Sequence, residues 1–532
     1  MFNAAEYFID RHLAEGRSDT IALECEEHRV SYGVLAEQVN RSGTAFRNQL
    51  SLRREERVLL LMLDGPQMVF AFFGAIKIGA VPVPINTFWT PADYEFVLQD
   101  SRAAVVVVSA SLYPRIADVL PRCPWIRHIV TVGRVDEGRT VEFDSLLRDG
   151  SPHLAAEPTS RDAPAFWLYS SGSTGHPKGC VHLQHDMVVC ADAYARGVLG
   201  IDASDRCFSV AKLFFAYGLG NAMYFPLAVG ATAILWPGPV PAPIVFDLIE
   251  RHRPTLFFSV PTHYAMLLAH QRDSGDFDLS CIRCAVSAGE ALPPSIFTRF
   301  RERFGVEILD GIGSTEVLHI FISNRRGSAR PGSSGLPVDG YEAKLVDELS
   351  MPVPRGVVGQ LLIKGDSTCA GYWNRHELTK NTIEGHWIRT GDHYYQDDDG
   401  YYWFAGRSDD MLKVGGMWVS PTEVEHTLTE HPAVVTCGVV GHADQDGLIK
   451  PLAYVVVTPE TAATPELARQ LQQFARERLA EYKRPRWVEF VHTLPTTATG
   501  KIQRFKLRER AAESTVNAQG SMHTPGSSDT SR

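Results

Sequence analysis

The sequence lacks an apolar run long enough to cross a membrane. Its most apolar region, RVLLLMLDGPQMVFAFFGAIKIGAVPVPIN at 57–86, is interrupted by Asp64, Gly65, Pro66 and Lys77. No stretch reaches the ~18–20 clean apolar residues of a membrane span. The N-terminus carries acidic residues early and has no long apolar segment, which argues against a signal peptide. We therefore expect a cytoplasmic, soluble protein without a membrane partner.

Positive charge and cysteine are also scarce. The chain has 52 Lys and Arg against 62 Asp and Glu, a net charge of −10. Nucleic acids and anionic membranes bind basic faces, so neither is expected as a general partner. The nine cysteines are scattered, and only Cys281 and Cys284 form a CxxC pair, with no second pair in the sequence to complete a zinc site. Reduced thiols are a better interpretation of that pair than a metal or redox role.

Two common catalytic signatures are missing. The stretch FWLYSSGSTGHPKGCVH at 166–182 places a loop rich in Ser, Gly and Thr between apolar segments, but Lys178 stands between Pro177 and Gly179, so the Walker pattern fails. No GxSxG nucleophile motif occurs either. What remains is a run of small residues whose backbone N–H groups can form an anion nest, with hydroxyl donors and Lys178 beside it. A plain surface turn is the alternative for such a loop.

The length of 532 residues exceeds the ~250–300 at which one core stops growing, so at least two domains are expected. Apolar runs at 57–63, 103–110, 283–289 and 305–313 alternate with helical patterns, which predicts an α/β fold with largely parallel sheets. From about 335 the pattern becomes alternating and turn-rich, typical of an antiparallel sheet or small barrel. We predict a large N-terminal domain, 1–408, with two α/β subdomains and a small β-barrel-like subdomain. A small α+β domain, 409–513, follows, and the tail 514–532 is predicted to be disordered.

The loop YSSGSTGHPKG resembles the phosphate-binding signature of the adenylate-forming enzymes, which include acyl- and aryl-CoA synthetases, firefly luciferase and the adenylation domains of peptide synthetases. Three further motifs resemble those of that superfamily: DGIGSTE at 310–316, the block at 389–425 that begins RTGD, and PTTATGKIQRFKLRE at 495–509. Their order and spacing extend the resemblance over essentially the whole chain.

Within the superfamily the sequence is most similar to the benzoate-CoA ligase group. The segments AKLFFAYGLGNAMYFPL at 211–227, DGIGSTEVLHIFISN at 310–324 and AGRSDDMLKVGGMWVSP at 405–421 resemble that group's own versions. Many acyl-CoA synthetases have an aromatic-His pair where this chain has Phe214-Phe215, and Tyr where it has Ile312. Both departures agree with the benzoate group.

The resemblance implies a reaction in two halves. A carboxylate attacks the α-phosphate of ATP to give an acyl-adenylate and pyrophosphate, and the thiol of coenzyme A then displaces AMP. Mg²⁺ is the implied cofactor, ATP and CoA are co-substrates, and an aromatic acid is the partner. Positioning and cationic groups at the phosphates should contribute most of the catalysis. A monomer or a homodimer is compatible with this chemistry.

The resemblance also assigns the ATP site. Thr315 would bind the α-phosphate, Glu316 would hold Mg²⁺, Asp392 would accept the ribose hydroxyls, and Arg407 would contact phosphate or ribose. The β- and γ-phosphates would be held by Ser170, Ser171, Gly172, Ser173, Thr174, Gly175 and Lys178, and the adenine by Gly289, Glu290, Ala291, Asp310, Gly311 and Ile312.

Lys501, in ATGKIQR, is the residue that the resemblance assigns to catalysis of adenylation. Its ammonium would bridge the substrate carboxylate and the α-phosphate, together with Thr315 and Glu316. The C-terminal domain would then rotate about a hinge at Asp409 for the thioester step, so it is expected to be mobile. The candidate CoA contacts are Lys413, Gly415, Gly416, Trp418, Lys450 and Arg484.

The acid would bind in a flat apolar slot that suits an aryl ring. The candidate lining is Phe214, Ala216, Tyr217, Gly218, Ser287, Ala288, Ile312, Leu318, His319 and Ile320. Phe214, Tyr217 and Ile320 could instead be ordinary core residues. His319 could orient a carboxylate, read a ring substituent, or be a satisfied buried histidine. Benzoate, a hydroxybenzoate and an aminobenzoate such as anthranilate all remain open.

Two other kinds of function compete with the aryl-CoA ligase. A free-standing adenylation enzyme would load the aryl acid onto the pantetheine of a separate carrier protein. A non-enzymatic binding homologue would need neither Lys501 nor Glu316, so the presence of both argues against it. Luciferase-like oxidation is a remoter option. Comparing CoA with a holo-carrier protein as the acceptor separates the first alternative from the ligase.

Overall fold

The computed structural model describes residues 1–136, 139–170, 176–272, 275–407, 410–414, 417–444, 448–496 and 502–520, without the side chains of 413, 417, 418 and 513–520. The described chain forms two compact units. The first comprises Met1–Lys344, Leu362–Thr390 and Asp397–Trp403, and the second comprises Leu345–Leu361, Gly391–Gln396 and the chain from Phe404 onward. The predicted hinge at Asp409 lies outside the described residues, so the domain boundary stays a prediction.

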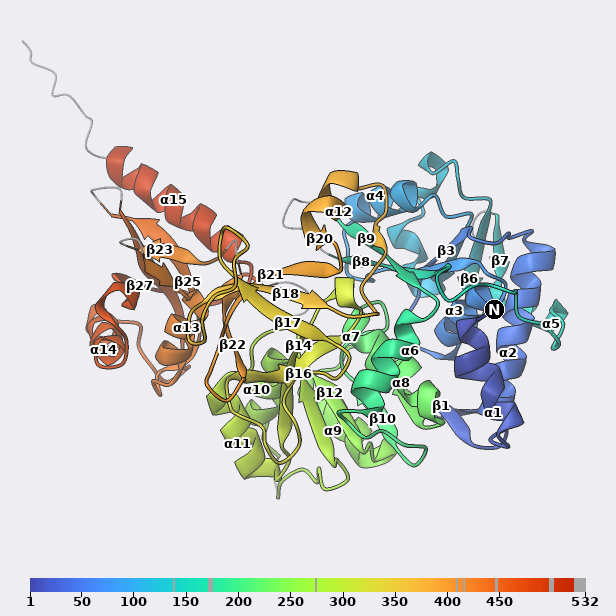
Figure 1. Ribbon diagram of the computed structural model, residues 1–532, viewed down its shortest axis with the longest axis horizontal. Helices are drawn as coiled ribbons and strands as arrows, with labels where there is room; N and C mark the ends of the chain where they lie inside the picture. Colours follow the sequence, from blue (N-terminus) through green and yellow to red (C-terminus); the bar gives the residue numbers. More distant parts are fainter. Residues whose placement is uncertain are drawn as a thin grey trace, which may run out of the picture. The chain divides into compact units, whose positions relative to one another are not determined.

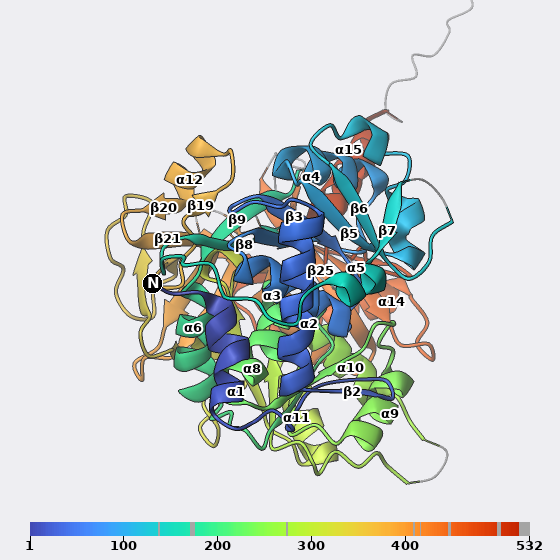
Figure 2. The ribbon, with the colours of Figure 1, turned by 90° about the vertical axis from the view of Figure 1, so that its right-hand side faces the viewer.

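A five-stranded sheet, in the order β4-β3-β5-β6-β7, forms the first α/β layer of the first unit (Figure 2). Its strands are all parallel, and they are β3 (Arg57–Leu61), β4 (Val81–Pro84), β5 (Val105–Ser109), β6 (His128–Val132) and β7 (Thr140–Glu142). The runs at 57–63 and 103–110 are thus strands, and α3 (Pro66–Lys77) is the buried helix predicted between them. Parallel pairing requires such crossovers, which explains the continuous apolar texture of this region.

A larger sheet follows the order β2-β1-β11-β10-β12-β13-β14-β15-β16. The strands from β1 to β14 along this path are parallel, and β2, β15 and β16 are antiparallel additions at its ends. Their bounds are β1 (Ile21–Cys25), β2 (His28–Ser31), β10 (Arg206–Ser209), β11 (Thr232–Leu235), β12 (Leu256–Ser259), β13 (Cys284–Ser287), β14 (Ile308–Gly313), β15 (Ile320–Ser323) and β16 (Ser333–Pro337). The carboxyl ends of β13 and β14 carry most of the residues predicted to bind adenine and acid.

Three helices cover the parallel part of this sheet (Figure 1). They are α9 (Ala242–His252), α10 (Pro261–Ala269) and α11 (Pro294–Phe304). Proline stands in the first turn of each, where its missing N–H is not needed, and Gly305 ends α11 in the left-handed conformation with φ +70°. Phe246, Tyr264, Phe297 and Phe300 pack with Phe257 of β12 into one core. The predicted strand–helix–strand unit at 283–313 is therefore confirmed.

A three-stranded antiparallel sheet, β19-β9-β8, carries the loop that resembles a phosphate-binding signature. β8 (Pro164–Ser170) and β9 (Lys178–Leu183) form a hairpin, and β19 (Gly371–Tyr372) pairs with the far side of β9. The apolar segments before and after the loop are thus its two strands. Ser170 lies opposite Lys178 in the register, so the loop starts and ends at one point of the hairpin.

The antiparallel part predicted from about 335 begins where β15 pairs with β16 and β16 pairs with residues 402 and 403 of β22 (Tyr402–Arg407). The remaining strands are β17 (Glu342–Val346), β18 (Gly359–Lys364), β20 (Ile383–Glu384) and β21 (Trp387–Gln396), with α12 (His376–Thr382) between β19 and β20. The backbone N–H of Asp397 donates to the carbonyl of Tyr401, which closes the turn between β21 and β22. This is the hairpin that DDDGYYWF predicts.

The second unit contains a sheet in the order β25-β26-β27, with β25 and β26 antiparallel and β26 and β27 parallel. The strands of this sheet are β25 (Val434–Ala443), β26 (Ile449–Val457) and β27 (Trp487–Phe490), and β23 (Leu412–Val414) and β24 (Met417–Val419) form a separate pair. The helices of this part are α13 (Pro421–Thr429), α14 (Pro465–Arg476) and α15 (Arg504–Gly520). Val424, Leu428, Val439, Val455 and Leu471 are buried together in its core. This agrees with the predicted α+β pattern. Helix α15 includes residues 514–520, the start of the segment expected to be disordered, and 521–532 lie outside the described residues.

The remaining helices belong to the first unit. They are α1 (Arg11–Ala14), α2 (Tyr32–Thr44), α4 (Pro91–Ser101), α5 (Phe143–Asp149), α6 (Asp186–Cys190), α7 (Ala216–Leu219) and α8 (Phe225–Val229), with short 3-10 or π segments between them. In the described part of the chain, no helix has both the length and the apolarity to span a membrane. All nine cysteines are free, and eight of them are buried.

Candidate functional site

The described ends of the phosphate-loop hairpin are Ser170 and Lys178. The ammonium of Lys178 lies 4.9 Å from the centre of the Tyr372 ring, a cation–π contact with β19. The side-chain oxygen of Ser170 is buried and has no hydrogen-bond partner among the described residues. Ser171, Gly172, Ser173, Thr174 and Gly175 lie outside the described residues, so their predicted role in holding phosphate stays a prediction.

Thr315 and Glu316 lie in a short 3-10 turn, Thr315–Val317, directly after β14. Ser314 caps the turn, because its hydroxyl accepts a hydrogen bond from the backbone N–H of Val317 at 3.3 Å. The hydroxyl of Tyr372 donates to Oε1 of Glu316 at 2.7 Å. The structure thus joins Lys178, Tyr372 and Glu316 in one chain of contacts across residues far apart in the sequence. A half-buried carboxylate is a group that can bind a hard cation together with phosphate oxygens.

The predicted adenine-binding residues follow two adjacent parallel strands. Ser287, the last residue of β13, lies opposite Asp310 of β14, and Gly289 follows with φ +92°, a conformation that favours glycine. Asp310 is buried and accepts a hydrogen bond from the N–H of Leu292. Burial raises the pKa of Asp310 well above the ordinary value of a carboxyl. Glu290, Ala291, Gly311 and Ile312 lie in the same two segments.

The structure places the predicted acyl-pocket residues in three segments. Phe214 precedes α7, whose first residues are Ala216, Tyr217 and Gly218; Ser287 ends β13 and Ala288 follows it; Leu318 and His319 precede β15, which begins at Ile320. The Tyr217 hydroxyl donates to the carbonyls of Ser259 and Val286, which fixes the ring against the carboxyl ends of β12 and β13. The structure brings Tyr217 and His319 of two of these segments into contact, with ring centroids 5.6 Å apart.

His319 is the polar member of this cluster and is 3% exposed. Its Nε2 lies 3.1 Å from Oδ1 of Asn221 and 3.3 Å from the carbonyl of Tyr217, so Nε2 carries the proton and donates. Burial lowers the pKa of His319 to about 3, which keeps the ring neutral. Nδ1 is then an acceptor, and it has no partner among the described residues. A neutral ring with one unpartnered acceptor can receive a hydrogen bond, but it supplies no charge to a carboxylate.

Sequence reasoning missed several residues that the structure adds to this cluster. Rings of Tyr194, Tyr224 and Phe225 pack around His319 with centroid distances of 5.5, 6.4 and 4.4 Å, respectively. Asn221 accepts the hydrogen bond from His319, and its own side-chain nitrogen has no partner among the described residues. Asn221, Tyr224 and Phe225 lie within the segment 211–227 that resembles the benzoate group, so that resemblance is the sequence feature that could have identified them.

The second unit brings Asp392 and Arg407 together. Nη1 of Arg407 lies 3.3 Å from Oδ1 of Asp392, which is 8% exposed. Gly391, with φ +77°, precedes the aspartate, and a Cβ there would come within 3.1 Å of the Arg407 guanidinium. The glycine in RTGD therefore allows the close approach of the two charged groups.

The predicted CoA contacts and the catalytic lysine also belong to the second unit. Lys413 of β23 lies opposite Trp418 of β24, but neither side chain is described. Lys450 lies on β26 opposite His442, and Nε of Arg484 donates to the carbonyl of Leu479. Asp409, Gly415, Gly416 and Lys501 lie outside the described residues, so their roles stay predictions.

Arg504, three residues after Lys501, anchors the start of α15. Its guanidinium contacts Glu425 of α13 at 2.6 Å and Asp410 at 3.4 Å, and Arg508 on the next turn contacts Asp410 at 2.7 Å. Glu425 also accepts a hydrogen bond from the N–H of Val439 at 2.7 Å. This network connects the chain that follows the lysine with the chain that follows the predicted hinge.

Comparison with known proteins matches the chain to the AMP-binding enzyme family over residues 10–373 and to the AMP-binding enzyme C-terminal domain over residues 423–501. A benzoate–CoA ligase of Thauera aromatica is 50% identical over 509 residues, covering 95% of this chain and 96% of its own. The crystal structure of the anthranilate CoA ligase AuaEII with anthranoyl-AMP superposes with a TM-score of 0.92 at 44% identity, covering 97% of this chain and 98% of its own. A benzoate CoA ligase from Burkholderia xenovorans LB400 superposes with a TM-score of 0.88 at 45% identity, covering 96% and 100%.

Proposed function

Since the chain belongs to the AMP-binding enzyme family, we propose that it is an AMP-forming aryl-CoA ligase that acts on benzoate or a close ring-substituted benzoate. The enzyme activates the carboxylate as an aryl-adenylate with release of pyrophosphate. It then transfers the aryl group to the thiol of coenzyme A and releases AMP. Relatives that carry out this type of reaction are similar to the chain over nearly its full length, which supports the assignment.

The adenylation half requires groups that hold ATP and stabilise charge on the α-phosphate. Thr315 hydrogen-bonds an α-phosphate oxygen, and Lys178 with the loop 170–175 holds the β- and γ-phosphates that leave as pyrophosphate. Asp392 binds the ribose hydroxyls. Lys501 bridges the attacking carboxylate and the α-phosphate, where its charge offsets the negative charge that builds up on phosphorus.

Glu316 is the residue proposed to hold Mg²⁺. Among the described residues no group of three or more His, Cys, Asp and Glu side chains is arranged to bind a metal, so a cation here would depend on Glu316, waters and phosphate oxygens. That donor set fits Mg²⁺, which keeps several waters and binds few carboxylates. When bound, the ion neutralises phosphate charge. The hydrogen bond from Tyr372 holds one carboxylate oxygen of Glu316, and the other would face the cation.

The ring-rich cluster around His319 is the observation that carries the choice of acid. Aromatic rings surround His319, which is kept neutral by its burial and is already bonded through Nε2. Such a lining favours an uncharged aryl ring over a long aliphatic chain. The remaining polar capacity, Nδ1 of His319 and the side-chain nitrogen of Asn221, can accommodate one donor and one acceptor on the ring.

A panel of acids tests the proposal. Benzoate, 2-aminobenzoate, 3- and 4-hydroxybenzoate and octanoate are each incubated with MgATP and CoA, and AMP is measured. We expect benzoate to have the highest kcat/KM and octanoate to be inert. Exclusive activity with octanoate would overturn the aryl assignment.

The acceptor is tested separately, because an adenylation enzyme can also load a carrier protein. Pre-formed benzoyl-adenylate is offered with CoA or with a holo-carrier protein, and thioester is measured by mass spectrometry. We expect CoA to be the better acceptor. Thioester formation on the carrier protein alone would favour the free-standing adenylation enzyme.

A further inference from the structure

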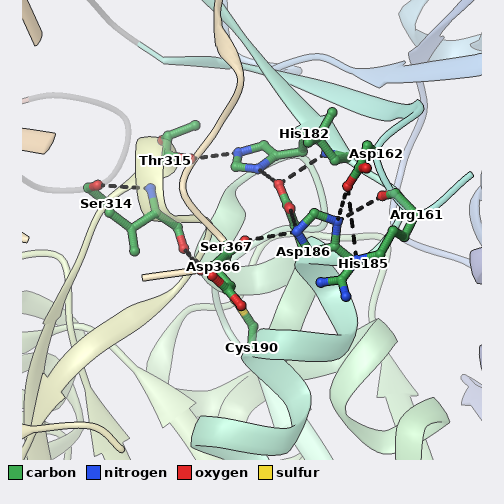
Figure 3. Close-up of polar contacts among 12 residues, drawn as sticks. Arg161, Asp162, His182, His185, Asp186, Cys190, Ser314, Thr315, Asp366 and Ser367 are labelled. Atoms are coloured by element: carbon green, nitrogen blue, oxygen red, sulfur yellow. Dashed lines mark hydrogen bonds and ion pairs between the residues drawn. The ribbon is translucent and has the colours of Figure 1, made fainter. Parts of the chain in front are cut away.

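The turn that carries Thr315 and Glu316 is held by its backbone as well as by its cap. Its three successive carbonyls each accept a hydrogen bond from a different residue. Nε2 of His182 lies 2.8 Å from the carbonyl of Thr315, the N–H of Cys369 lies 2.7 Å from that of Glu316, and the hydroxyl of Ser367 lies 2.8 Å from that of Val317. Figure 3 shows the His182 ring between the Thr315 turn and α6. We call these three bonds the carbonyl clamp.

The geometry at His182 determines which way its bonds run. A carbonyl only accepts, so Nε2 carries a proton and donates it to Thr315. On the other side of the ring, Nδ1 lies 2.8 Å from Oδ2 of Asp186, which also accepts from the N–H of Leu183 at 3.0 Å. Both side chains are fully buried, and the ring stacks on Phe166 of β8 at 5.2 Å. The imidazole is therefore fixed in position, tilt and proton placement.

The surroundings of His182 also shift its protonation. Burial by itself would lower the pKa of His182, but the hydrogen bond and charge of Asp186 outweigh it, and the pKa is raised. Both ring nitrogens are engaged, Nδ1 by the Asp186 carboxyl and Nε2 by the Thr315 carbonyl, each at 2.8 Å. A ring that is held at both nitrogens suits a group that must hold a backbone segment in place.

The backbone after the turn requires such a restraint. Leu318 has φ +71°, a conformation that is unfavourable for a residue with a Cβ, and its side chain is fully buried. Strain of this kind costs about 1–3 kcal/mol and persists only where surrounding structure over-determines it. The carbonyl clamp precedes Leu318 directly, and the pocket residue His319 follows it. Loss of the clamp would let the turn relax and move Thr315 and Glu316.

His185, in the same segment as His182, supports the part of the carbonyl clamp that comes from Ser367. His185 directs Nδ1 to the carbonyl of Arg161 at 2.7 Å and Nε2 to the carbonyl of Asp366 at 3.0 Å. Asp366 directly precedes Ser367, whose hydroxyl also contacts that of Tyr341 at 2.7 Å. The segment from His182 to Asp186 thus contacts the Thr315 turn through His182. Through His185 it also contacts the carbonyl of Asp366, next to Ser367, which holds the same turn (Figure 3).

We propose that His182, oriented by Asp186, is a positioning residue for adenylation, because its bond to the Thr315 carbonyl presents the Thr315 hydroxyl and the Glu316 carboxylate to MgATP. The proposal rests on the phosphate and magnesium roles given to Thr315 and Glu316 under the proposed function. It adds a residue that does not itself contact the nucleotide. It also gives a role to the buried His182–Asp186 pair, whose histidine belongs to strand β9 of the phosphate-loop hairpin.

Two substitutions separate positioning from packing. In His182→Gln the amide nitrogen reaches about as far as Nε2 and can still donate to the Thr315 carbonyl, whereas the bond to Asp186 is lost. In His182→Asn the shorter amide can still donate to Asp186, whereas the bond to Thr315 is lost. Each variant removes one bond of the same ring, and both should lower the free energy of unfolding in urea.

Pyrophosphate exchange and MgATP binding by calorimetry are the readouts. We expect His182→Asn to lower kcat/KM for MgATP by about 10- to 100-fold, and His182→Gln to stay within about threefold of the wild type, with KM for benzoate unchanged in both. MgATP affinity should follow the same order. Equal losses in the two variants, or no loss in His182→Asn, would overturn the proposal.

The proposed function can fail independently. If the wild type adenylates no aryl acid, that function is wrong, and MgATP affinity alone decides the role of His182 by the same order of variants. A wild type that binds no MgATP would overturn both. If His182→Asn does not fold, Ser367→Ala, which removes the bond to the Val317 carbonyl, takes its place. A kcat/KM for MgATP equal to the wild-type value in that variant would contradict the clamp.

Discussion

Two segments that are assigned to the same phosphate are held in different ways. In the first unit, the Thr315 turn is restrained through its backbone carbonyls, which accept hydrogen bonds from His182 and Ser367. His182 in turn contacts Asp186, and both of these side chains are fully buried. The chain that follows Lys501 in the second unit is restrained through side-chain charges, by Arg504 and Arg508 against Glu425 and Asp410. The Arg508 side chain is 40% exposed.

The difference corresponds to what each segment has to do. Buried hydrogen bonds are little affected by salt and keep one geometry, which suits the proposed role of the turn in holding ATP in place. In the second unit the Arg504–Glu425 pair is largely buried, whereas the Arg508–Asp410 pair is partly exposed, and therefore weaker and screened by salt. The role proposed for Lys501, which is to act in one half-reaction and withdraw in the next, calls for an anchor that orders the start of α15 without holding the lysine itself.

The largest effect should come from the lysine itself. Lys501→Ala removes the charge that offsets the build-up on the α-phosphate, so aryl-adenylate formation should fall by about 100- to 1000-fold or more. Conversion of pre-made benzoyl-adenylate and CoA to thioester should continue. Lys506→Ala, an exposed lysine on α15, is the control and should change neither step. Equal failure of both half-reactions in Lys501→Ala would refute its assigned role.

Next in size is the anchor of the second unit. Arg504→Met leaves the buried Glu425 carboxylate without its cation, which should cost about 3 kcal/mol of stability of the C-terminal unit, measured by urea unfolding. Arg508→Met removes a more exposed pair and should cost at most about 1 kcal/mol, decreasing as salt is added. Similar losses for the two arginines would mean that burial does not distinguish them.

The hinge is tested by a substitution that restricts the backbone. Asp409→Pro fixes φ near −65°, so rotation of the C-terminal unit should be blocked, with pyrophosphate exchange largely retained and thioester formation reduced by about tenfold or more. Asp409→Ala removes the carboxylate but keeps the backbone free, and it should support both steps. Normal overall turnover in the proline variant would remove the hinge hypothesis.

The smallest expected effect is at Tyr372. Tyr372→Phe keeps the ring beneath the Lys178 ammonium but removes the hydroxyl that donates to Glu316, so kcat/KM for MgATP should fall by roughly fivefold, about 1 kcal/mol. Tyr401→Phe, which loses a hydroxyl bonded to the Ser328 carbonyl, is the matched control. A Tyr372→Phe enzyme with an unchanged Mg²⁺ dependence would show that this bond does not orient Glu316.

The fold could largely be predicted because its elements are encoded locally. Valine runs such as 105–108 are strands, and Ser-Pro or Pro-Pro pairs mark the starts of α13 and α11. Helix α15 was not predicted: the sequence marked 495–509 only as a motif, and disorder was expected from 514, where Ser, Thr and Asn are weak helix formers. The pairing of β19 with β9 joins residues about 190 apart, and no local pattern announces it.

The candidate site was predictable as a set of motifs but not as a set of contacts. Thr315, Glu316 and the pocket residues could be named because each lies inside a motif. Tyr372 and His182 could not, since Tyr372 contacts Glu316 across 56 residues and His182 contacts the Thr315 carbonyl across 133. The sequence left the role of His319 open, and only the structure shows that its burial lowers its pKa and that its Nε2 is bonded to Asn221.

By itself the sequence determined most of the succession of strands and helices, the phosphate-loop and lysine motifs, and the aromatic character of the segments proposed to bind the acid, because each depends on neighbouring residues. Only the tertiary structure decided which groups hold the Thr315 turn. A hydrogen bond to a backbone carbonyl depends on where the fold places a distant side chain. Because every residue of a turn has the same carbonyl group, the sequence does not indicate which one is bonded. The contact between His182 and the Thr315 carbonyl therefore forms only in the folded chain, where β9 lies close to the turn that follows β14.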